Sequence, residues 1–205
     1  MTHLRVDARE NRDRVLQAAR DLFGERGLDV TMREIARHAG VGPATLYRRF
    51  PTRQHLVAAA FEDELELCRS VVLDGAGHPD AWSGIRSVVE QIVELNARNQ
   101  GFVDALIAEG HISDRIVAHR SELFRALAAL TRRAKAEGTL RQDFVVDDLL
   151  LVLLAARGLR GGDVRERAIA ARRFGALALD AFRASDTNDR LPEPARVAAA
   201  ALGRV

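Results

Sequence analysis

The chain is poor in the residues and runs that mark secreted, membrane or disulfide-stabilised proteins. Its 205 residues include a single cysteine, Cys68, so no disulfide can form within the chain. The longest apolar run, residues 149–156, is less than half the length of a membrane span. The N-terminal residues are charged and do not resemble a signal peptide. We therefore expect a soluble, cytoplasmic protein without a membrane partner.

Aromatic residues, prolines and β-branched runs are also scarce. Aromatics make up 5% of the chain and prolines number five, whereas 47% of the residues are hydrophobic. This balance favours helices over sheets, and it predicts an all-α protein. The length allows one large domain or two small ones.

Motifs of the common enzyme classes are missing from the sequence. It has no HExxH, no Cys-x-x-Cys, no phosphate-binding Gly-x-x-x-x-Gly-Lys and no GxSxG. The nearest metal-like group is His111, Asp114, His119 and Glu122, a spacing that surface residues often show. We expect no catalytic site, no metal and no cofactor. The alternative is a helical enzyme or metal-binding protein with an incidental helix-turn-helix.

Positive charge is concentrated in the first third of the chain. Residues 1–60 contain eleven arginines, no lysine and seven acidic residues, a net charge of +4, although the whole chain carries only +2. The remainder is slightly acidic. This distribution is typical of a nucleic-acid-binding head on a neutral body, although a merely solvated surface can also produce it.

Helical periodicity and stop signals divide the head into short helices. Asn11 is a candidate cap for the first helix, which should end near Gly27. Thr31 and Glu34 form the sequence of a capping box at the start of a second. After a Gly-Val-Gly link, a proline opens a third helix over residues 43–50. Two short helices joined by a three-residue turn predict a helix-turn-helix.

The same residues carry a family signature. The pattern T-x-x-x-I-A-x-x-A-G-V followed by T-L-Y-x-x-F resembles that of the tetracycline-repressor (TetR) family, and here it reads Thr31, Ile35, Ala36, Ala39, Gly40, Val41, Thr45, Leu46, Tyr47 and Phe50. The resemblance covers roughly residues 11–60. It implies a ligand-responsive, homodimeric DNA-binding regulator, usually a repressor. The run LYRRFPTR is also similar to a branch whose ligand domain is described as SbtR-like.

Two positions depart from the usual family pattern. Arg49 stands where the family most often has histidine, and Arg53 stands where it most often has lysine. Both residues keep or add positive charge. We therefore expect phosphate binding to persist with different detailed contacts.

The predicted DNA contacts combine phosphate grips with a base-reading tip. Helix N-termini near Thr31 and Thr52 favour an anion, and the Tyr47 hydroxyl can donate to a phosphate, although Tyr47 also fits a half-buried packing role. The tip offers few hydrogen-bonding groups, which leaves Thr45 and Arg48 as polar readers. The full predicted set is Thr31, Arg33, Gly42, Pro43, Ala44, Thr45, Tyr47, Arg48, Arg49, Thr52 and Arg53.

Longer helices are predicted for the rest of the chain. We expect a fourth helix that starts near Thr52 and joins head to body, then a break at residues 74–80. Further helices follow at about 82–101, 102–109, 114–137, 147–157 and 164–183, and the chain ends in a polar tail. The predicted domains are a DNA-binding domain (1–54), a ligand-binding and dimerisation domain (55–184) and a tail (185–205).

The body should supply a subunit interface and an effector pocket. Residues 149–154 are apolar all round, so helices 147–157 and 164–183 are either core or the interface of a homodimer, the form that a palindromic operator in double-stranded DNA requires. Ligand sites in helical bundles lie between long helices. Candidate lining residues for a small-molecule effector of unknown identity are Phe61, Leu65, Trp82, Val89, Val93, Asn96, Phe102, Leu106, His111 and Phe124.

Overall fold

The computed structural model describes residues 2–98, 101–102, 105, 114–159 and 163–194. Its α-helices are α1 (Thr2–Arg26), α2 (Met32–His38), α3 (Pro43–Arg49), α4 (Arg53–Ala60), α5 (Glu62–Gly77), α6 (Ala81–Arg98), α8 (Asp114–Ala136), α9 (Val146–Arg157) and α10 (Val164–Phe182), with a 3₁₀ turn at Gly27–Asp29. Within these residues there is no strand, only an isolated bridge between Leu140 and Arg183. The all-α prediction is confirmed.

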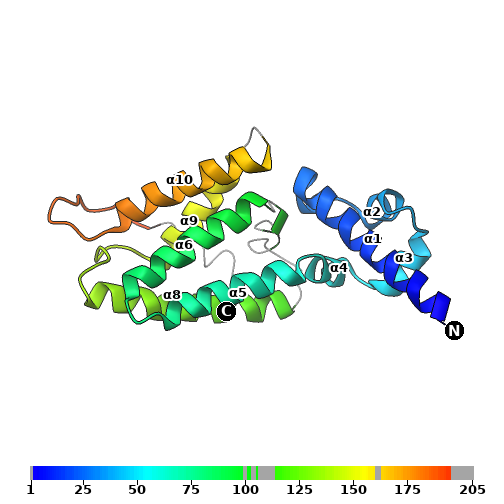
Figure 1. Ribbon diagram of the computed structural model, residues 1–205, viewed down its shortest axis with the longest axis horizontal. Coiled ribbons are helices and arrows are strands. Elements are labelled where there is room, and N and C mark those ends of the chain that lie inside the picture. The colour runs from blue at the N-terminus through cyan, green and yellow to red at the C-terminus, as the bar shows by residue number, and fades with distance from the viewer. Residues whose placement is uncertain (1, 99–100, 103–104, 106–113, 160–162, 195–205) are drawn as a thin grey trace.

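Helices α1 to α4 form a head at one end of an elongated molecule (Figure 1). Helix α1 packs against α2 and α4, and α2 packs against α3. Phe23, Ile35, Leu46 and Leu56 are fully buried where these helices meet. The apolar stripes predicted from the sequence therefore close the core of the head.

The first helix is longer than predicted. It begins at Thr2 instead of near Asn11, which lies inside α1 and accepts a hydrogen bond from Arg14 one turn later. Several strong helix formers precede Asn11, and their summed propensity outweighs the capping preference of one asparagine. The prediction of a cap at Asn11 is wrong.

The predicted fourth helix is divided in two. Phe61, with φ −112° and ψ 21°, separates α4 from α5. Three acidic residues occupy the first turn of α5, where the helix dipole favours negative charge. Helix α5 continues to Gly77, so the break expected from residue 74 begins later. In Figure 1, α4 leads from the head and α5 enters the body.

Helix α6 lies at the centre of the body. It packs against α5, α8, α9 and α10, and Figure 1 shows it between α10 and the α5–α8 layer. It approaches α5 closely because both helices carry a glycine at the crossing. A Cβ atom on Gly84 would lie 2.3 Å from the carbonyl oxygen of Gly75. Any larger residue there would separate the two helices.

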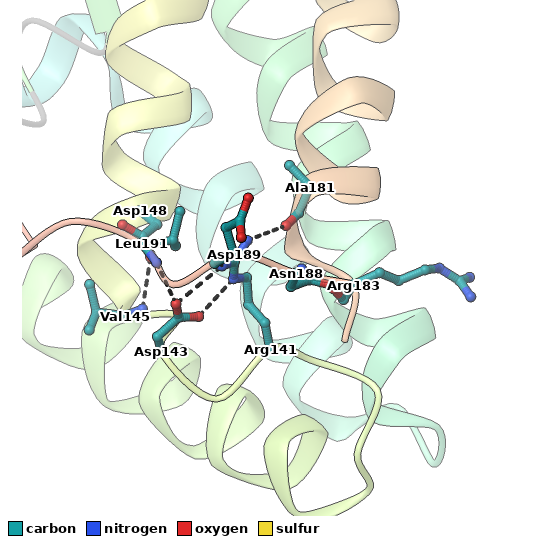
Figure 2. Close-up of polar contacts among 9 residues, drawn as sticks. All are labelled: Arg141, Asp143, Val145, Asp148, Ala181, Arg183, Asn188, Asp189 and Leu191. Carbon is teal, nitrogen blue, oxygen red and sulfur yellow. Dashed lines mark hydrogen bonds and ion pairs between the residues drawn. The ribbon is translucent and has the colours of Figure 1, made fainter. Parts of the chain in front are cut away.

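The end of the body far from the head is fastened by a polar network (Figure 2). Arg141 donates to both carboxylate oxygens of Asp143, at 2.7 and 3.1 Å, and to the carbonyl oxygen of Ala181. Asp143 also accepts a hydrogen bond from the Leu191 N–H at 2.8 Å. These contacts hold the described part of the tail against the α8–α9 loop. Across the described residues, none of the helices combines the length and apolarity that a membrane crossing requires.

Candidate functional site

A tight turn fixes the position of α3. Gly40 has φ +65°, a conformation that favours glycine, and the Val41 N–H donates to the Ala36 carbonyl oxygen at 3.0 Å. Pro43 occupies the first turn of α3, where its missing N–H costs nothing. Leu46 is fully buried beneath α3. The opposite face of α3 is therefore turned to solvent.

The predicted contact residues gather on this solvent-facing side of the head. Tyr47 is 46% exposed despite its aromatic ring, and Thr45 is half-buried. The other exposed members are Thr31, Arg33, Gly42, Pro43, Ala44, Arg48, Arg49 and Thr52. Together they form a surface with arginines around an apolar tip, which suits a phosphate backbone flanking a groove.

The two threonines predicted as phosphate contacts also cap helices. The Glu34 N–H donates to the Thr31 hydroxyl at 3.2 Å, and the Thr31 N–H donates to the Glu34 carboxylate at 2.8 Å, which completes the predicted capping box. These hydrogen bonds lower the pKa of Glu34. Arg26 pairs with the same carboxylate at 3.1 Å, so its negative charge is balanced beside the basic surface. Thr52 caps α4 in a similar way.

Arg53 differs from the other predicted contacts because its side chain turns inward. Its guanidinium donates to the Val30 carbonyl oxygen and lies 5.7 Å from the centre of the Phe23 ring. Partial burial lowers the pKa of Arg53. These contacts tie α4 to α1 and to the loop before α2, a structural role that the sequence did not indicate.

An apolar cavity lies between the helices of the body. It offers about 70 Å³ to the centre of a water-sized sphere, which is room for several waters or part of a small ligand. Of the predicted lining residues, Val89, Val93 and Phe124 are present. The lining that the sequence did not single out is Cys68, Val72, Val88, Ile92, Arg120, Leu123, Leu127, Val146, Leu149, Leu150, Val152 and Leu153.

The remaining predicted lining residues lie elsewhere. Phe61 and Phe102 belong to an aromatic cluster at the joint between head and body, with ring centres 6.1 Å apart. Leu65 is buried in α5 outside the cavity wall. Trp82 is covered by the Arg183 guanidinium, 4.9 Å from its ring centre. Leu106 and His111 lie outside the described residues.

Asn96 is buried beside the cavity instead of within its lining. Its side-chain amide donates to the carbonyl oxygen of Leu153 at 3.1 Å, and Leu153 is a lining residue of α9. This hydrogen bond links α6 to α9. Asn96 therefore supports the cavity wall.

Arg120 is the only charged side chain among the lining residues that the structure describes. It is 4% exposed, and burial lowers its pKa to about 10. One of its terminal nitrogens donates to the Ala105 carbonyl oxygen at 3.4 Å. A sequence signal was available, because Arg120 falls on the apolar stripe of α8, four residues after Ile116 and three before Leu123.

The metal-like group considered from the sequence has other contacts. Glu122 pairs with Arg69 of α5 through two hydrogen bonds of 2.9 Å, which lower the pKa of Glu122. His119 is buried, and burial lowers its pKa. Asp114 is exposed at the start of α8. The described residues contain no group of three or more histidine, cysteine or acidic side chains arranged to hold a metal.

Comparisons with known proteins agree with this arrangement. Residues 15–60 match the model of the tetR family of bacterial regulatory proteins. A TetR transcriptional regulator from Streptomyces coelicolor is 30% identical in sequence, over 85% of this chain and 99% of that chain, with a TM-score of 0.51. The fold is also similar to that of the TetR family regulator PfmR from Thermus thermophilus, with 21% identity, a TM-score of 0.65 and coverage of 86% and 98%.

A sequence relative extends the likeness beyond the head. An HTH-type transcriptional regulator of Mycobacterium tuberculosis is 29% identical over 165 residues, which cover 77% of this chain and 84% of that protein. The similarity therefore includes much of the body as well as the helix-turn-helix.

Proposed function

Because the chain belongs to the tetR family of bacterial regulatory proteins, we propose that it is a homodimeric cytoplasmic repressor that a small-molecule effector releases from a palindromic operator. The division into a DNA-binding domain (1–54), a ligand-binding and dimerisation domain (55–184) and a tail (185–205) is part of this proposal. The observation that carries it is the exposed basic face of α3, held outward by the turn before Pro43.

The DNA-binding part is tested by selection and substitution. DNA selected from a random pool by the full-length protein should contain two-fold symmetric half-sites about one helical turn, ~34 Å, or a multiple of it apart. Arg48→Ala should weaken operator binding, because an exposed arginine of α3 is then lost. Arg132→Ala removes an exposed arginine from α8 in the body and serves as the matched control. Equal effects of the two changes would argue against α3 as the recognition helix.

The dimer is supported by bulky apolar side chains that remain in solvent on α9 and α10. Ile169 and Leu177 are 51% and 60% exposed, two helical turns apart, and Leu151 is 40% exposed. We propose that a second copy of the chain covers them. This choice of residues is narrower than the sequence allowed, since Leu153 lines the cavity and Phe182 packs edge-on against Phe144.

Sedimentation of a double variant tests this interface. Ile169→Glu combined with Leu177→Glu should give monomers that bind the operator poorly, because two charges would be buried in an apolar contact. Leu67→Glu is the matched control, since Leu67 is 50% exposed on α5. If the double variant stays dimeric, or if Leu67→Glu alone separates the subunits, the interface lies elsewhere.

We propose that the effector acts through the joint between head and body. Phe61, at the break between α4 and α5, lies between Phe23 of the head and Phe102 of the body, with ring centres 5.9 and 6.1 Å away. Arg20 of α1 donates to the Ala60 carbonyl oxygen at 2.6 Å. A shift of the chain that follows α6 would therefore be transmitted to α1 and α4, and through them to the spacing of the two heads.

A further inference from the structure

The cavity wall has an unusual composition for a site that binds a small molecule. Its lining is hydrophobic on every side except at Arg120, which α8 contributes from its N-terminal half. The part of the wall that the structure describes contains no aspartate or glutamate. Any molecule in this cavity therefore meets hydrocarbon surface and one guanidinium.

A guanidinium in such a place favours a particular partner. Burial of Arg120, which is only 4% exposed, opposes its charged form. A carboxylate offers two coplanar acceptors that match the fork of guanidinium N–H donors, and such charge-assisted pairs strengthen where water is excluded. A neutral apolar molecule gains nothing from the charge. The wall therefore distinguishes an acid from its neutral analogue.

The cavity also gives the ligand a direction and a length. Along α8 the lining runs from Arg120 past Leu123 and Phe124 to Leu127, a rise of roughly 10 Å for seven residues of α-helix. The far end is closed by Val146 at the start of α9. A molecule with its charged group at Arg120 therefore places its remaining atoms entirely among aliphatic and aromatic side chains.

We infer that the effector is an apolar monocarboxylate whose carboxylate pairs with Arg120 and whose hydrocarbon part extends along α8 toward Leu127. This assignment rests on the proposed function and names the chemical class of its effector. The affinity for straight-chain acids then rises about fourfold per added methylene until the cavity is full. The same acids release the operator.

Calorimetry with octanoate, hexanoate and 1-octanol on the full-length protein tests the assignment. Octanoate should bind more tightly than hexanoate, and about ten- to a hundredfold more tightly than 1-octanol, because the alcohol lacks the charged acceptor. Arg120→Met keeps an unbranched apolar side chain and should remove the preference for the acid. Arg125→Met, an exposed arginine on the same helix, is the matched control and should leave the preference intact.

The outcomes separate the effector class from the proposed function. If 1-octanol binds as well as octanoate, or if neither acid binds, the carboxylate assignment is overturned, while operator binding by the same protein still supports a repressor. Failure of the unmodified protein to bind any selected DNA would instead defeat the proposed function. Should Arg120→Met not fold, as judged by circular dichroism, the acid-to-alcohol ratio of the unmodified protein and of Arg120→Lys decides the matter.

Discussion

Replacing Arg53 with alanine should destabilise the head without changing how DNA binding depends on salt. The guanidinium makes a charge-assisted hydrogen bond to the Val30 carbonyl oxygen and lies over the Phe23 ring. A hydrogen bond to a charged group contributes about 1.5–3 kcal/mol, and a partly exposed cation–π contact about 0.5–1 kcal/mol. Because Arg53 is only partly buried, we take the lower ends and expect a loss of about 2 kcal/mol.

Urea unfolding and salt-dependent operator binding together test this expectation. A loss of about 2 kcal/mol lowers the urea midpoint by roughly 1 M for a typical dependence on denaturant. If Arg53 contacts no phosphate, the slope of log K against log salt stays unchanged. Arg33→Ala is the comparison: it removes an exposed arginine at the start of α2, and loss of a phosphate contact there would make the slope shallower by about 0.9.

The reverse pattern would refute the reasoning. A variant Arg53→Ala that unfolds at the same urea concentration as the unmodified protein, and whose salt slope falls by about 0.9, would show that the guanidinium leaves Val30 when DNA binds. Arg53 would then act as the phosphate contact that the family resemblance implies.

Two further changes probe the joint and the far end of the body. Gly101→Ala would bring a Cβ atom to 2.9 Å from the α1 backbone, so operator affinity should change by about 2- to 30-fold in a binding assay, whereas Gly77→Ala, with nothing within 4 Å, should have no effect. Unchanged affinity for both would exclude this contact as a coupling element. Arg141 holds the pKa of Asp143 well below its ordinary value, so the stability that this pair contributes is present at neutral pH and is lost as pH falls through the folded-state pKa. Asp143→Asn should therefore lower the melting temperature at pH 7 more than Asp186→Asn does, with a gap that narrows below about pH 4; a gap that is independent of pH would contradict this.

Local chemistry was enough to predict most of the head. The Thr31 capping box, the left-handed Gly40 and Pro43 in the first turn of α3 each depend on a few neighbouring residues, and all three occur as predicted. The divided fourth helix was missed although its signal was local too. Glu62 opens a run of acidic side chains that favours a helix start, but the uninterrupted apolar stripe through Phe61 masked it.

The cavity lining could not be predicted in the same way because it depends on how helices distant in sequence meet. Helix α9 is apolar on almost every side, and only packing against α6 and α8 decides that Leu149 faces the cavity while Leu151 remains 40% exposed. Arg120 stands in a helix rich in arginine, and only its place on the apolar stripe distinguishes it from Arg125, which is exposed.

The position of the cavity relative to the joint limits how an effector can work. Helix α6 lines the cavity with Val93 and ends at Arg98, and Gly101 then abuts α1 directly. A ligand that changes the packing of α6 thus acts on the head through contacts without free space, and a close-packed contact favours two discrete arrangements over gradual deformation. Coupling in such systems is about 1–3 kcal/mol, and it is reciprocal. Operator DNA must therefore weaken effector binding by the same factor by which the effector weakens operator binding. A ratio that differs between the two titrations would mean that the effector acts at a second place on the molecule.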